Sequence, residues 1–170
     1  MGAGLPLDLP EITSAFPHIA LIPILSDSRG IAVILKKWIK KKNRLPDAIV
    51  IEHPAHAGGH LGATRIDDIN NPKFEFDRVL AETHQVFRDL QLAERQVPLI
   101  VAGGINQHAQ VAHYLENGAS AVQLGTAFAV TQEGDAHENF KQVLANAGPD
   151  DIVEFMSVAG LPPAPCSRPG

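Results

Sequence analysis

The sequence predicts an α/β fold built on a parallel sheet, and two patterns indicate it. Four short runs rich in β-branched residues are almost continuously apolar, as strands buried on both faces of a parallel sheet are: 19–25, 48–52, 97–102 and 121–124. A longer segment with helical spacing follows each run. Strands that alternate with helices in this way form a parallel sheet with helical crossovers.

The helices follow from the spacing of their apolar residues. After a loop over 1–9 and a short helix over 10–16, the segments with helical spacing are 28–42, 75–92, 106–117 and 136–147. Asp27 or Ser28 can cap the first of these, and Asn106 can cap the third, which Gly118 ends. The last helix would bury a face of Phe140, Val143, Leu144 and Ala147. The proline-rich segment 162–170 has no periodicity and is predicted to be an unstructured tail.

Composition excludes several classes of protein. The chain has 170 residues, 45% of them hydrophobic and 19% charged, which is enough for one well-buried core. No apolar run reaches the about 18 residues that a membrane helix needs, and residues 1–10 do not resemble a secretory signal. A single cysteine, Cys166, excludes a disulfide scaffold, and a net charge of −5 argues against nucleic-acid binding. We therefore expect a soluble, cytoplasmic protein.

Glycines lie where three of the predicted strands end. The second strand leads into a loop with Gly58 and Gly59, the third into Gly103 and Gly104, and the fourth into Gly125 and Thr126. Carboxyl ends of parallel strands form the ligand-binding edge of such folds, and glycine there lets backbone N–H groups approach a phosphate. Two successive strands that end in Gly-Gly and Gly-Thr are typical of a barrel phosphate site. The alternative is that these glycines only form tight turns.

Three of the eight histidines, His53, His56 and His60, lie in one loop after the second strand. Imidazole groups bind zinc, iron and copper, so a metal site is one interpretation. Pro54 and the Gly58-Gly59 pair prevent the helix on which this spacing would work, and no acidic residue lies at a helical offset. A second interpretation is that His60, beside two glycines that leave room for a planar ligand, removes a proton from a carbon acid. A purely structural His60 is the third.

These segments together resemble the nitronate monooxygenase family, formerly called 2-nitropropane dioxygenases. The motifs that carry the resemblance span residues 2–161: GAGLP at 2–6, LPDA at 45–48, AGGHLG at 57–62, AGGI at 102–105 and GASAVQLGT at 118–126, continued over 128–133. The family consists of FMN-dependent TIM-type barrels and includes the flavin-dependent enoyl-acyl-carrier-protein reductases. The combination of these motifs at these distances is specific, whereas each motif alone is weak.

The resemblance implies a role for each matching residue. His60 is similar to the family's catalytic base beside the flavin, and Gly58 and Gly59 to the backbone neighbours of the isoalloxazine. The FMN phosphate cradle corresponds to Gly103, Gly104, Gly125 and Thr126, with Gln123 close by. In the family, the base takes the α-proton of a nitroalkane, or the nitronate binds directly. Flavin and O2 then convert the substrate to a carbonyl compound and nitrite.

The sequence also departs from the family pattern. Many members carry a lysine where this chain has Leu25, Ser26 and Asp27, and members begin with four further βα units. The four predicted strands therefore correspond to strands five to eight of a barrel that needs about 250 residues. We expect residues 1–161 to form this FMN-binding partial barrel. Segment 162–170 does not match the family, and a truncated or frame-shifted end would explain it.

Other functions compete with a nitronate monooxygenase. The chain could belong to a flavin-dependent enoyl-thioester reductase, it could be an inactive half-barrel fragment, or it could bind a metal through His53, His56 and His60. An open half-barrel has two edge strands, which invite pairing with another chain. We therefore predict a homo-oligomer, or docking on a separately encoded first half, with a nitronate or nitroalkane and O2 as the small-molecule partners.

Overall fold

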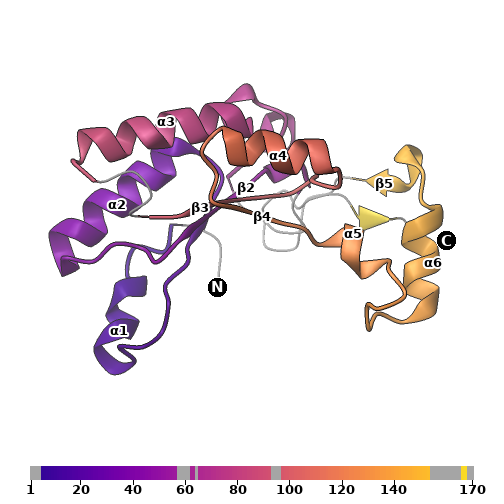
Figure 1. Cartoon of the computed structure of the whole chain (residues 1–170), viewed down its shortest axis with the longest axis horizontal. Helices are drawn as coiled ribbons and strands as arrows, with labels where there is room; N and C mark the ends of the chain where they lie inside the picture. Colours follow the sequence, from indigo (N-terminus) through magenta and orange to yellow (C-terminus); the bar gives the residue numbers. More distant parts are fainter. Residues whose placement is uncertain (1–4, 57–61, 64, 93–96, 154–165, 168–170) are drawn as a thin grey trace.

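The main sheet is parallel and lies at the centre of the molecule (Figure 1). The computed structural model describes residues 5–56, 62–63, 65–92, 97–153 and 166–167. Among these residues the sheet has the order β1-β2-β3-β4, with every neighbouring pair parallel. Its strands are β1 (Ile24–Leu25), β2 (Ile49–Glu52), β3 (Leu99–Ala102) and β4 (Ala121–Gln123). The predicted parallel α/β fold is confirmed.

Helices connect the strands and cover one face of the sheet (Figure 1). The first strand leads into α2 (Ser28–Lys42), the second into α3 (Phe76–Asp89) and the third into α4 (His108–Glu116). Apolar side chains of α2 and α3, such as Trp38 and Leu80, pack in one buried cluster with Ile51 of β2 and Val101 of β3. The other helices are α1 (Ile12–Ala15), α5 (Thr126–Ala129) and α6 (Glu138–Asn146), with short 3-10 turns at Leu9–Glu11, Pro54–His56, Ile66–Asp68, Pro72–Phe74 and Pro149–Asp151.

Helix α2 begins and ends where its sequence predicts. The Asp27 carboxylate accepts a hydrogen bond of 2.7 Å from the Gly30 backbone N–H. At the other end Asn43 adopts a left-handed conformation with φ 47°, directly after Lys40, Lys41 and Lys42. An acidic cap at the amino end and cations near the carboxyl end both complement the helix dipole.

The first strand is shorter than predicted. We expected residues 19–25 to form it, but only Ile24 and Leu25 pair with β2. Pro23 has no N–H to donate, so it contributes only its carbonyl, which accepts from Val50 N–H at 3.0 Å. Leu21 also runs beside the start of β2, and its N–H donates to the Asp47 carboxylate at 2.7 Å. The segment therefore follows the sheet without a continuous ladder.

The carboxyl-terminal part differs from the prediction in four ways. Helix α4 is capped by Gln107 and Gln110 rather than by Asn106. Helix α5 was not predicted, and the expected apolar face of α6 is half exposed, with Phe140 at 52% and Val143 at 53%. Within the predicted unstructured tail, Cys166–Ser167 form β6, which pairs antiparallel with β5 (Ile152–Val153).

The expectation that both faces of the sheet are buried holds for the inner strand β2, whose Ile49, Val50 and Ile51 are all buried, but not for edge strand β1. Side chains alternate along a strand, so Leu25 faces the helix layer and Ile24 faces the opposite side. Leu25 is 4% exposed, whereas Ile24 is 39% exposed. Helices α2, α3 and α4 lie over one face (Figure 1), and the opposite face is partly open at the edge strand β1, where Ile24 is exposed. In the described part of the chain, no helix has the length and apolar character to cross a membrane.

Candidate functional site

The predicted phosphate-binding residues lie together at the carboxyl end of the sheet. Ala102, the last residue of β3, is in register with Gln123, the last residue of β4. Gly103 and Gly104 follow the first of these, and Gly125 and Thr126 follow the second after one residue. Because neighbouring parallel strands end at the same edge, the two turns are adjacent, and the prediction that they share an edge is confirmed.

Gly103 and Gly104 are glycines for two reasons: both have a positive φ, and His56 packs against both. Their φ angles are +108° and +70°, a region that other residues rarely adopt. A Cβ on Gly103 would lie 3.1 Å from the Cβ of His56, and one on Gly104 would lie 2.9 Å from the His56 Cδ2. The loop after β2 therefore packs directly on the turn after β3. The tight turn therefore explains these two glycines in part, which is what the interpretation without a phosphate site proposes.

Gly125 is different, because no described residue packs on it. Among the described residues, a Cβ built there meets no atom within 4 Å, and its φ of −109° is not in the left-handed region that favours glycine. Thr126, the next residue, is exposed and begins α5. Packing among the described residues does not require a glycine at this position. Among the described residues, the space beside Gly125 is therefore open, and the exposed Thr126 lies next to it at the edge where the β3 turn also lies.

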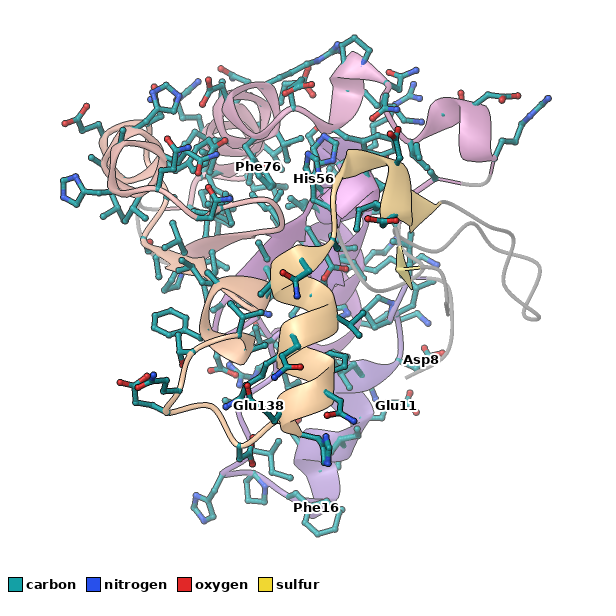
Figure 2. All side chains as sticks on the ribbon, turned by 90° about the vertical axis from the view of Figure 1, so that its right-hand side faces the viewer. Asp8, Glu11, Phe16, His56, Phe76 and Glu138 are labelled. Carbon is teal, nitrogen blue, oxygen red and sulfur yellow. The ribbon has the colours of Figure 1, made fainter. Side chains whose placement is uncertain are left out.

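His53 joins the loop after β2 to helix α3. Figure 2 shows the labelled His56 and Phe76, and the His53 ring lies against both, with centroid distances of 4.9 Å and 5.7 Å. Its Nδ1 accepts a hydrogen bond of 3.2 Å from the Ala55 N–H, so the proton of the neutral ring lies on Nε2. Burial lowers the pKa of His53; nearby His56 lowers it further and Glu75 opposes this. This histidine is thus a neutral structural group.

Ser26 was not predicted as a site residue, yet the structure singles it out. It directly follows β1, is 4% exposed, and its hydroxyl has no hydrogen-bond partner among the described residues. Gly62, with φ +90°, lies so close that a Cβ there would collide with the Ser26 side chain. The contact sets where the chain returns to the sheet after segment 57–61. The signal in the sequence was the departure from the family's lysine at this place.

The remaining predicted site residues, His60, Gly58 and Gly59, lie outside the described residues. The proposed three-histidine metal site includes His60, so its geometry is not defined by the described part of the chain. Within that part, no three His, Cys, Asp or Glu side chains gather in a way that would hold a metal ion. A groove of about 580 Å³ lies at the opposite end of the sheet, before β2, and is lined by residues such as Asn43, Arg44 and Leu90. It does not include the predicted site.

Comparison with known proteins identifies the family. The sequence profile of the nitronate monooxygenase family matches residues 1–163. The chain belongs to the nitronate monooxygenase family. A nitronate monooxygenase of Paraburkholderia phytofirmans is 36% identical over 100 residues, which are 58% of this chain and 24% of that protein. A probable nitronate monooxygenase of Staphylococcus aureus is 27% identical over 154 residues, which are 87% of this chain and 40% of that protein.

Solved structures confirm the fold of this family member. FabK from Thermotoga maritima is 23% identical with a TM-score of 0.67, over 95% of this chain and 43% of that one. A nitroalkane oxidase from Streptomyces ansochromogenes is 23% identical with a TM-score of 0.63, over 91% of this chain and 41% of that one. These neighbours are TIM-barrel enzymes, so the predicted partial barrel is confirmed. The chain spans less than half the length of these relatives.

Proposed function

We propose that this chain provides the FMN phosphate site of a nitronate monooxygenase-like oxidoreductase. Family membership supports a flavin enzyme, and the open space at Gly125 is the observation in the structure that supports the location. Gly103, Gly104, Gly125 and Thr126 would hold the phosphate, with Gln123 beside them at the end of β4. The substrate would be a nitronate or nitroalkane, and O2 would be the second substrate.

The residues present fit a phosphate group. A phosphate needs several N–H or hydroxyl donors on a surface without bulky side chains. The turn after β4 offers the Thr126 hydroxyl next to a glycine with no neighbour on its open side. The turn after β3 offers Gly104, which is exposed. FMN, when bound, supplies the redox chemistry, while the protein binds the phosphate and orients the cofactor.

The proton transfer is assigned to His60 as part of the same proposal. An imidazole titrates near neutrality, so it can take the α-proton of a nitroalkane, a contribution of about 10²–10⁴-fold in rate. His53 does not suit this role, because it is 7% exposed and its Nδ1 already accepts from Ala55. Replacing His60 by Asn should abolish nitroalkane turnover and leave FMN affinity unchanged. A simultaneous loss of FMN binding would instead assign His60 a structural role.

The Gly125→Ala variant tests the phosphate site. The added methyl group would meet no atom of the described residues, so the free energy of unfolding should change little, while FMN affinity should fall about tenfold, or about 1.4 kcal/mol. Gly104→Ala is the variant for comparison. The left-handed backbone of Gly104 makes alanine cost about 1–2 kcal/mol of unfolding free energy there, unlike at Gly125. Affinity would be measured by quenching of FMN fluorescence and stability by urea unfolding. Unchanged FMN affinity of the Gly125→Ala variant would overturn the location.

A flavin-dependent enoyl-thioester reductase is the second candidate. An enoyl reductase domain of MlnA from Bacillus amyloliquefaciens shares the fold, with a TM-score of 0.55 and 18% identity over 84% of this chain. The two functions differ in what reduces bound flavin. Bleaching of the 450 nm flavin band by a nitroalkane without O2 would support the first, and bleaching by NAD(P)H with later reoxidation by an enoyl thioester the second. A protein that binds no FMN would be an inactive half-barrel.

The acidic composition with one cysteine supports a cytoplasmic location, which cell fractionation would test.

A further inference from the structure

Most exposed large apolar side chains lie on segments that adjoin the two edge strands in the sequence. Among the described residues, the large hydrophobic side chains that are more than about a third exposed mostly lie in one of two groups. One group precedes or belongs to edge strand β1, and the other follows edge strand β4. The first group is Leu5, Ile12, Phe16, Ile19, Ile22 and Ile24; the second is Phe128, Phe140, Val143 and Ile152.

The edges differ in this respect from the rest of the surface. Outside the two groups, only Val33 on α2 and Leu115 on α4 are large, apolar and comparably exposed among the described residues. Phe16, labelled in Figure 2, lies at an extremity of the molecule and is 59% exposed. Contiguous apolar exposure marks interaction surfaces, and unpaired strand edges invite another strand. Among the described residues, β1 and β4 are the two edge strands, and the segments next to them in the sequence carry most of the exposed large apolar side chains.

The open face of the sheet adds to this surface. Ile24, Val50, Ile100 and Ala121 occupy one row across the four strands by their register, on the side away from the helix layer. Ile24 at one edge of the row is 39% exposed, whereas Val50 inside the sheet is 6% exposed. The exposed fraction in this apolar row is larger at the edge strand than inside the sheet. This is expected of residues that line the interior of a barrel when the barrel is incomplete.

A second copy can complete such a ring by symmetry alone. A two-fold axis parallel to the strands keeps all strands of both copies parallel. It also places β4 of each copy beside β1 of the other, because these are the two edges of one sheet. Four strands from each copy make eight, the number that closes a barrel whose interior is filled by side chains. Closure removes every edge at once.

We propose that two copies of this chain assemble into one eight-stranded parallel barrel through β4–β1 contacts at both edges. The barrel buries the row of Ile24, Val50, Ile100 and Ala121 in its interior. Phe128, Phe140 and Val143 cover the seam next to the partner's Ile19 and Ile22. The carboxyl ends of all strands then open at the same mouth, so each copy brings its Gly104 and Gly125 turns to it. The assembly does not depend on which reaction the site performs.

The register of the seam follows from barrel geometry. Within one chain, Gln123 continues the row of Ala102 and Glu52, which reaches β1 at Ser26. A barrel of this kind has a shear of about 8 residues, so each half contributes about 4. Four residues before Ser26 lies Ile22, in the extended segment that precedes β1, whereas four residues after it lies helix α2. Gln123 of one copy should therefore face Ile22 of the other.

Site-specific cross-linking tests this seam. In a Cys166→Ser background, Ile22→Cys and Gln123→Cys chains are prepared separately, mixed by unfolding and refolding, and treated with a short bis-maleimide. The mixture should give a covalent dimer, and neither chain alone should give one. A dimer from Ile22→Cys alone or from Gln123→Cys alone would show β1–β1 or β4–β4 pairing and overturn the proposal, as would no dimer in the mixture.

Mass measurement by light scattering gives an independent test. The unmodified chain should have twice the mass of one copy, and Ile24→Lys should shift it toward the monomer. Leu115→Lys is the matched control, because Leu115 is 45% exposed but lies on α4, which follows the inner strand β3. Circular dichroism confirms that each variant is folded before its mass is interpreted. A monomeric unmodified chain, or an open polymer of many copies, would contradict ring closure.

Discussion

Individual side chains at the carboxyl end of the sheet carry two different tasks. His53 and His56 fill space: the first packs on Phe76, and the second packs on Gly103 and Gly104. Gly125, by contrast, leaves the space beside it open among the described residues. In the sequence, all three histidines of the loop look equivalent, since imidazole suits a metal, a base or a core position. Only the contacts separate His53, which is enclosed, from a histidine available to a ligand.

The pKa of His53 predicts how stability depends on pH. Because burial lowers this pKa in the folded protein, the unfolded chain binds the proton more readily once the pH falls below about 6.5. Stability should therefore be complete above that pH and decrease as the pH falls through the folded-state value. Urea unfolding between pH 8 and pH 5 would measure this decrease, and His53→Asn should make it smaller. The exposed His108→Asn variant is the control, and an equal effect of both would contradict the assignment.

At the scale of elements, helices were easier to predict than strands. Helix α2 has an apolar face, an acidic cap and terminal lysines, all local in the sequence, and its observed bounds equal the predicted ones. The strand before it depends on partners instead, and Pro23 limits its pairing. For α6, the spacing predicted the helix, but no neighbour among the described residues buries Phe140 or Val143.

The cap of α2 gives a prediction for a single helix end. Asp27→Ala removes the acceptor for the Gly30 N–H and should cost about 1 kcal/mol of unfolding free energy. Asp27→Asn keeps an acceptor oxygen at the same place and should lose much less. Both variants would be compared by urea unfolding at the same pH. Equal losses would mean that charge near the helix dipole, rather than the hydrogen bond, stabilises this end.

Stability is unevenly distributed over the whole molecule. Strands β2 and β3 lie inside the sheet and under the helix layer, and Ile49, Ile51 and Val101 are fully buried. Helix α1 has no buried residue. Amide hydrogen exchange should therefore be slowest in β2 and β3 and fast in α1, since local opening needs least energy where little is buried. Mass spectrometry of peptides from these segments would measure it, and equal protection would contradict this order.

The sequence by itself determined the alternation of strands and helices, the parallel direction of the sheet and the membership of the nitronate monooxygenase family. These properties follow from local periodicity and from short motifs, which do not depend on distant partners. It also placed Gly103, Gly104, Gly125 and Thr126 at one edge, because parallel strands end together. Their separate tasks were not visible in it.

The tertiary structure decided what depends on which segments meet. It showed that His56 requires Gly103 and Gly104, that Gly125 has free space, and that Ser26 lies under Gly62. It also showed that one face and both edges of the sheet stay partly open, although the strands read as buried on both sides. An apolar pattern in a strand indicates that its side chains favour burial. Whether anything covers that side chain depends on which elements pack against it, and this is a property of the assembled fold.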